Sequence, residues 1–205
     1  MAWLNAIIAE VKQGRPELAY YSDMHSYEST RQQYRPTQIK LLLIAESPPP
    51  ANDSNSSRQF YRTDILFPDD RLFSNTIKAL YVEAKDISAA DLEQQKEKWL
   101  HKFQADGNYM IEALDTSLPH EVTKQQRQAL IAQSMTKLLA RVKKLAGPDT
   151  KIILIKSNVF EVATEPLRNA GFTVLNTELV DYPGRFNQKV YRAKLSDLVA
   201  SQPRR

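Results

Sequence analysis

Residues 41–50 read LLLIAESPPP, and this stretch decides how the rest of the chain is interpreted. Five apolar residues in a row are typical of a strand that is buried on both faces of a parallel sheet. The prolines that follow stop any helix from forming there, because proline lacks the backbone N–H that a helix needs. Glu46 lies between the two. Because a buried carboxylate is costly unless it is paired, Glu46 is either structural or the edge of an active site.

Predicted strands alternate with predicted amphipathic helices beyond residue 38. We expect strands at residues 39–45, 108–114, 151–155 and 172–175. We expect helices at the stretch that carries Leu72, Ile77, Leu80 and Val82, and at residues 89–104, 125–146, 159–170 and 188–199. Ser88 and Asp91 have the spacing of a capping box, which predicts a helix start. The alternation predicts the α/β class, as a three-layer αβα sandwich with a four-stranded parallel sheet.

The chain has 205 residues, and we expect a single domain. Hydrophobic residues make up 42 % of it and charged residues 25 %, which is ordinary for a globular protein. We assign residues 1–38 to an N-terminal helical extension, with a first helix at residues 2–13. Residues 39–200 form the predicted α/β core.

The sequence also lacks the signatures of several classes of function. It has no cysteine, which excludes disulfides, thiolate metal sites and thiol nucleophiles. His25, His101 and His120 lie far apart without ligand spacing, so we expect no metal. Without a P-loop or a GxGxxG motif, we expect no cofactor. No apolar run reaches the ~18 residues of a membrane span and no signal peptide is evident, so we expect a cytoplasmic monomer that does not enter a membrane.

Positive charge is concentrated in two stretches of a chain whose formal net charge is +4. Residues 124–147 contain lysines and arginines but no acid, and residues 182–205 contain Asp197 as their single acid. Such a distribution permits binding to nucleic acid. Alternatively, the two basic stretches are solvated helix faces, or they form the interaction surface of a structural adaptor protein.

Ligands bind outside the carboxyl ends of the strands in open parallel sheets. Those ends carry Glu46 after the first predicted strand, Asp115 after the second and Lys156 after the third. The loop DYPGRFN adds Gly184, which suits a tight turn or the close approach of a ligand, and Arg185. We expect these residues to share one rim, although polar residues are common at strand ends that bind nothing.

An aromatic pair, Phe60 and Tyr61, follows the proline-rich loop after Glu46. One interpretation is a platform on which a planar ring such as a nucleobase stacks, worth ~1–3 kcal/mol per base. The other is a hydrophobic clip that ties the loop to the core. The sequence does not choose between them.

Taken together, these motifs resemble the uracil-DNA glycosylase superfamily. AESPP is similar to the family's first motif, G-E-x-P-G or G-x-D-P, with Glu46 at the acidic position. Phe60 or Tyr61 then occupies the place of the aromatic residue that stacks on the base. NYMIEALDTSLP is similar to the second motif and places Glu112 where an asparagine often reads the base. The alternative for Glu112 is an outward-facing residue on an edge strand.

The later motifs follow in the family's order. KIILIKSNVFEVATEPLRNAG is similar to the third strand with its helix. NTELVDYPGRFN looks like the terminal H-P-S motif, whose loop enters the DNA minor groove, with Tyr182 in place of the histidine and Gly184 in place of the serine. The resemblance covers residues 39–200 and implies a uracil-DNA glycosylase-like fold.

The resemblance implies a hydrolase that cleaves the N-glycosidic bond of a damaged or deaminated base flipped out of DNA. Glu46 would activate a water or stabilise an oxocarbenium-like sugar. Tyr182 or Arg185 would donate a hydrogen bond to the departing base. Glu112 would accept one from an exocyclic amine, which would favour a base other than uracil.

DNA is the partner that the resemblance implies. Lys156, Lys189 and Arg192 are the candidates for contacts with the strand backbone, and the backbone amide of Gly184 would approach a phosphate. The alternative is a non-catalytic member of the same fold that binds nucleic acid or a nucleotide through the same rim.

Overall fold

The computed structural model of the chain describes residues 27–49, 59–64 and 70–201. The helix expected at residues 2–13 lies outside these ranges. Within them, residues 27–33 are helical, in a segment whose sequence has no clear pattern.

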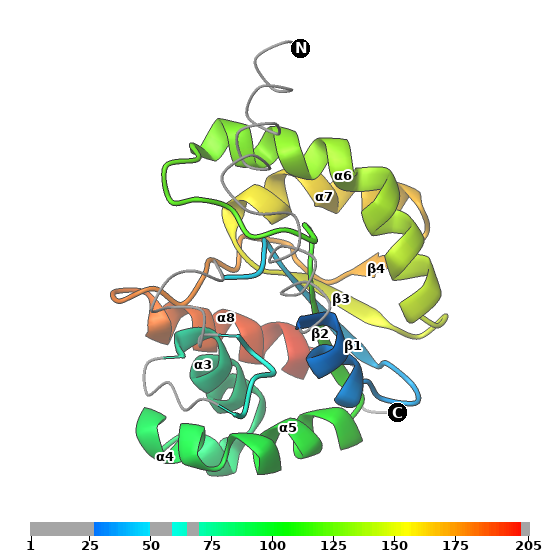
Figure 1. Ribbon diagram of the computed structural model, residues 1–205. Helices are drawn as coiled ribbons and strands as arrows, with labels where there is room; N and C mark the ends of the chain where they lie inside the picture. The colour runs from blue at the N-terminus through cyan, green and yellow to red at the C-terminus, as the bar shows by residue number, and fades with distance from the viewer. Residues whose placement is uncertain (1–26, 50–58, 65–69, 202–205) are drawn as a thin grey trace.

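A four-stranded parallel sheet forms the centre of the molecule (Figure 1). Its strands, in the spatial order β2-β1-β3-β4, are β1 (Leu41–Ala45), β2 (Asn108–Glu112), β3 (Lys151–Leu154) and β4 (Thr173–Val174). Leu41 is in register with Asn108 on one side and with Lys151 on the other. All five residues of β1 are buried, as expected for a central strand with helices on both faces. The predicted strands and their parallel arrangement are confirmed.

Helices cover both faces of the sheet. They are α3 (Arg71–Leu80), α4 (Ala89–Gln94), α5 (Lys96–Ala105), α6 (Lys124–Leu145), α7 (Ser157–Asn169) and α8 (Gln188–Ala200), with a short 3-10 turn, η1 (Val82–Ala84). In Figure 1, α6 and α7 lie above the sheet, whereas α3, α4, α5 and α8 lie below it. None of the helices in the described part of the chain combines the length and the apolar composition that crossing a membrane requires.

Two helix predictions are wrong in detail: Val82 lies beyond the end of α3, in η1, and residues 89–104 form two helices that meet at Gln95. The start is as predicted, with the Ser88 hydroxyl accepting a hydrogen bond from the Asp91 amide. At the break, Glu93 and Lys96 both turn inward. The Lys96 ammonium lies 3.0 Å from carboxylate oxygens of Glu93 and Asp70, and all three side chains are buried. The two acids compensate the charge of this buried lysine. The helical periodicity of the sequence does not reveal these ion pairs.

The turn before β2 depends on Gly107. Its φ of +83° lies in the left-handed region, and its carbonyl accepts hydrogen bonds from the amides of Lys40 and Leu41 at 2.8 and 3.2 Å. A Cβ atom at this position would lie 2.8 Å from Lys40 Cγ and 3.0 Å from the Gln38 carbonyl oxygen. The backbone oxygen cannot move aside without disturbing the segment that leads into β1.

Gly107→Ala should therefore lower the free energy of unfolding by about 2–5 kcal/mol, from left-handed strain of ~1–2 kcal/mol and a close contact of ~1–3 kcal/mol. Gly171→Ala is the matched control, because Gly171 has a φ of +87° with nothing within 4 Å of the added Cβ. It should cost only the ~1–2 kcal/mol of strain. Urea unfolding followed by circular dichroism measures both, and equal losses would contradict the steric argument.

Candidate functional site

The carboxyl ends of β1, β2 and β3 open onto a pocket of about 270 Å³. This is the edge of a parallel sheet at which ligands are expected. Residues with acidic, cationic and aromatic side chains line it, among them Glu46, Glu112, Arg127, Lys156, Phe60 and Tyr182. The pocket therefore combines charged, aromatic and aliphatic lining residues.

Glu46 follows β1 directly, and its residue is only 5 % exposed. One carboxylate oxygen, Oε2, accepts from Arg127 Nη1 at 3.0 Å and from the Lys156 ammonium. The other, Oε1, accepts from the side-chain amide of Asn158. The buried negative charge is thus compensated by two cations and oriented by three donors.

Arg127 reaches Glu46 from the first turn of α6. That helix starts at a capping box in which Thr123 and Gln126 satisfy each other's backbone amides. The remaining guanidinium nitrogens donate to the carbonyls of Val122 and Pro119, at 2.9 and 2.7 Å. These hydrogen bonds fix the orientation of the Arg127 guanidinium, so that its Nη1 points at Glu46.

Lys156 reaches Glu46 from the junction of β3 and α7. Its φ is +81°, an uncommon value for a residue with a side chain. Its amide donates to the Val180 carbonyl at 2.8 Å, which fixes the backbone at this junction. Left-handed strain of ~1–3 kcal/mol persists only where surrounding contacts enforce it, and such strain clusters at functional sites.

Glu112, the last residue of β2, is the second buried acid of the pocket. Its Oε1 accepts from the Tyr27 hydroxyl, and its Oε2 accepts from Arg31 Nη1 at 3.0 Å. Burial raises the pKa of Glu112, while Arg31 and the Tyr27 hydrogen bond oppose that rise. Both partners come from the helical residues 27–33.

The aromatic pair is buried. Phe60 lines the pocket and meets the rings of Tyr61 and Phe73 edge-on, with centroids 5.0 and 5.7 Å apart. Tyr61 is fully buried, and its hydroxyl accepts from the Met110 amide at 2.7 Å. The buried position of Tyr61 agrees with the interpretation of this residue as a hydrophobic clip. Phe60 lines the pocket and can therefore contact a ligand.

The loop between β4 and α8 brings Tyr182 to the pocket, with the residue 39 % exposed. The Gly184 amide donates to the Tyr182 carbonyl at 2.7 Å, so this loop turns tightly, as the glycine predicted. Arg185 is exposed, and its guanidinium lies 5.7 Å from the centre of the Phe186 ring. Gly184 and Arg185 are not among the residues that line the pocket.

One more predicted rim residue, Asp115, and two candidates for contacts with the DNA backbone, Lys189 and Arg192, are not among the residues that line the pocket. Asp115 is exposed and pairs with Arg141 of α6. Lys189 is exposed on α8. Arg192 donates to Asn75 Oδ1 at 2.6 Å, which ties α8 to α3. The structure therefore gathers Glu46, Glu112, Lys156, Phe60 and Tyr182, and leaves the others outside.

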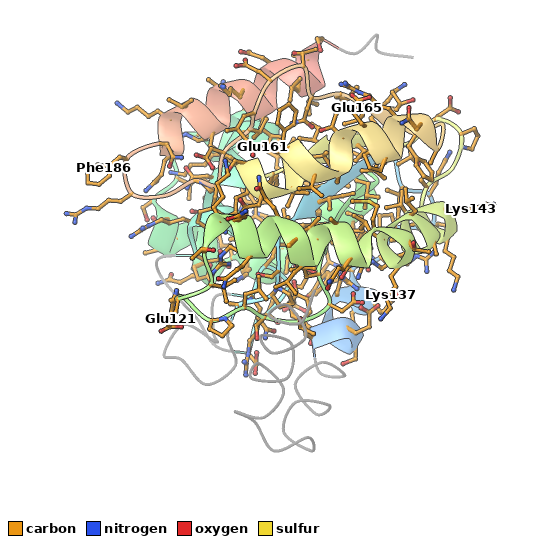
Figure 2. The ribbon with its side chains drawn as sticks, turned by 90° about the horizontal axis from the view of Figure 1, so that it is seen from above. Glu121, Lys137, Lys143, Glu161, Glu165 and Phe186 are labelled. Atoms are coloured by element: carbon orange, nitrogen blue, oxygen red, sulfur yellow. The ribbon has the colours of Figure 1, made fainter. Side chains whose placement is uncertain are left out.

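Several residues of the site were not predicted. Arg127 could have been found, because the first turn of a helix that follows a parallel strand lies at the same edge of the sheet as the strand's carboxyl end. Phe186 also had a signal, since it is a large apolar residue in a polar loop. It is 94 % exposed, and Figure 2 shows it at the outer tip of that loop. No sequence pattern identifies Asn158, Tyr27 or Arg31 as residues of the site.

Among the described residues, no group of three or more histidine, aspartate or glutamate side chains is arranged to hold a metal ion. Comparison of the chain with protein-family models, with curated proteins and with solved structures finds no match. The site has to be interpreted from its own geometry.

Three buried tyrosines give a prediction for alkaline pH. Burial raises the pKa of Tyr109 to about 12 and raises the pKa values of Tyr27 and Tyr61 well above their usual range. Their contribution to stability should be complete below pH ~10 and lost as the pH rises toward 12. An absorbance titration of phenolate, with circular dichroism in parallel, should show late ionisation coupled to unfolding.

The chain denatured in urea is the control, because all nine tyrosines should then titrate near ~10. Ionisation of every tyrosine near pH 10 in the folded protein would contradict the assignment of these phenols to a closed interior.

Proposed function

We propose that this chain accepts one base flipped out of DNA and hydrolyses its N-glycosidic bond, as a divergent relative of the uracil-DNA glycosylase superfamily. One observation carries the proposal: the Glu46 carboxylate is held at the wall of a pocket that suits a single base. At about 270 Å³ the pocket lies at the small end of ligand sites, which span roughly 300–1,000 Å³. A base with its sugar is a better match to this volume than a dinucleotide.

Glu46 supplies a fixed negative charge in this mechanism. Cleavage of a glycosidic bond passes through an oxocarbenium-like sugar, whose positive charge a nearby carboxylate stabilises. Arg127, Lys156 and Asn158 orient Glu46 before the reaction, so little reorganisation is needed when the charge develops. The same carboxylate orients the attacking water.

Tyr182 and Phe60 complete the proposed site from its aromatic walls. Tyr182 is partly exposed at the mouth of the pocket, from where its hydroxyl donates to the departing base. Phe60 contacts the face of the base in this small cavity. Both roles use side chains that line the pocket.

The loop beside the pocket is suited to contact with duplex DNA. Phe186 projects from it with 94 % exposure, and apolar side chains of this kind insert between base steps. Arg185 and Lys189 are exposed on either side and are suited to phosphate contacts. The kink that such a wedge produces would help a base to leave the stack.

A second candidate is binding of a base or nucleotide without hydrolysis. It is favoured by the same three donors on Glu46, because a carboxylate so fully paired also serves as a structural anchor. The two candidates predict the same ligands but differ in turnover.

Base release from oligonucleotides that carry uracil, hypoxanthine, xanthine or alkylated bases tests the proposal. Glu46→Gln keeps the shape but removes the charge, and should slow release by roughly 10²–10³-fold, as expected for loss of one preorganised electrostatic group. Asp115→Asn is the matched control, because Asp115 also follows a strand but does not line the pocket. Unchanged release by Glu46→Gln would refute the role of Glu46, and no release from any substrate would favour binding alone.

Two variants separate the apolar from the ionic contribution to the affinity for DNA. Phe186→Ala should weaken binding to duplex DNA without changing stability or salt dependence, since the ring is almost fully exposed. Lys189→Gln should reduce the slope of log K against log salt by about 0.9, the value for one phosphate contact. Fluorescence anisotropy at several salt concentrations measures both. An unchanged affinity of Phe186→Ala would contradict the proposed wedge.

A further inference from the structure

Three buried side chains form a unit at the β2 wall of the pocket. Glu112 receives one hydrogen bond on each carboxylate oxygen, from the Tyr27 hydroxyl and from Arg31 Nη1. The three residues are between 4 and 7 % exposed. Tyr27 and Glu112 line the pocket, and Arg31 supports Glu112 from behind while it also pairs with Glu28.

This unit presents acceptors and no donor to a ligand. The Arg31 guanidinium is cationic at any accessible pH and favours the ionised form of Glu112. An ionised carboxylate has about four lone-pair sites and no proton to donate. Two of those sites are taken by Tyr27 and Arg31, which leaves others for a ligand. The single hydroxyl proton of Tyr27 is already used in its bond to Glu112.

A base with a carbonyl oxygen at this wall would place two acceptors against each other with no proton between them. Both would lose water on binding without gaining a partner, which a buried site rejects strongly. A base with an exocyclic amino group would instead donate to Glu112, as cytosine does to acidic side chains in DNA readout.

Resting on the proposed function, we infer that Glu112, held by Tyr27 and Arg31, selects bases that keep an exocyclic amino group. The substrate class is then lesions of the cytosine or adenine type, such as oxidised or alkylated forms. The deaminated products, in which a carbonyl oxygen replaces the amine, are rejected. Glu112 is the specificity-determining residue, and Tyr27 and Arg31 are positioning residues.

Matched pairs of bases test this inference. Release of 5-hydroxycytosine should exceed release of 5-hydroxyuracil from the same oligonucleotide by roughly 10- to 100-fold. Binding of free cytosine against uracil, and of adenine against hypoxanthine, is measured by calorimetry on the full chain and requires no turnover. A preference of the same direction is expected there, and equal binding or an opposite preference would overturn the inference.

Glu112→Gln replaces an acceptor-only group with one that also donates. The preference for bases with an exocyclic amine over bases with a carbonyl oxygen in its place (the amino and oxo bases), measured as the ratio of their release or of their affinities, should therefore fall to near one or invert. Asp115→Asn is the control, with an unchanged ratio expected. Because Glu112→Gln leaves Arg31 without its buried partner, folding is checked by circular dichroism. Tyr27→Phe is the second variant, and it should lower the ratio several-fold by releasing the carboxylate. An unchanged ratio in both variants would overturn the inference.

The two proposals fail separately. Release that depends on Glu46 but prefers the oxo bases would refute the selection by Glu112 and leave the glycosidic reaction standing. Absence of release from every oligonucleotide, with calorimetric preference for cytosine and adenine that Glu112→Gln removes, would refute the reaction and leave the selection standing.

Discussion

The rest of the site depends on compensating one buried charge, that of Glu46. Its partners arrive from the first turn of α6 and from the junction of β3 and α7, so three segments meet at a single carboxylate. Removing one side of a buried ion pair costs roughly 3–5 kcal/mol, because the other charge is left without compensation. Glu46 is therefore structural and part of the pocket at once, and the two interpretations that LLLIAESPPP leaves open do not exclude each other.

Much of the fold could be predicted because its signals are local. LLLIA and the IIL of β3 are short apolar runs, and a strand buried on both faces needs no other pattern. The long helix α6 was predicted to within a residue at each end, since its periodicity extends over many turns. The break at Gln95 was missed, and the Lys96–Asp70 ion pair beside it joins residues 26 positions apart, which no local pattern reveals.

The predicted pocket residues came from strand ends and from motifs, whereas most of their hydrogen-bond partners were not predicted. Glu46 and Lys156 follow from the rule that parallel strands end at one edge, whereas Glu112 followed from the resemblance of NYMIEALDTSLP to the second motif. The Tyr27–Glu112 bond joins residues 85 positions apart in sequence, and no local pattern marks either partner for the other. Arg192 is the opposite case, since its charge suggested a phosphate contact but its guanidinium is bound to Asn75 in the interface between α8 and α3. Side-chain partners of this kind are determined by packing, which a single sequence does not display.

The order of the strands has a consequence for biosynthesis. β1 is central, yet its neighbours begin at Asn108 and Lys151, so it leaves the ribosome long before either of them. Contacts between distant parts of a chain slow folding, because a large loop must close before any contact stabilises it. During that interval the segment LLLIA is an unpaired apolar strand, of the kind that aggregates or is captured by chaperones. Residues that are buried in the folded molecule are thus exposed in the nascent chain until both neighbouring strands have been made.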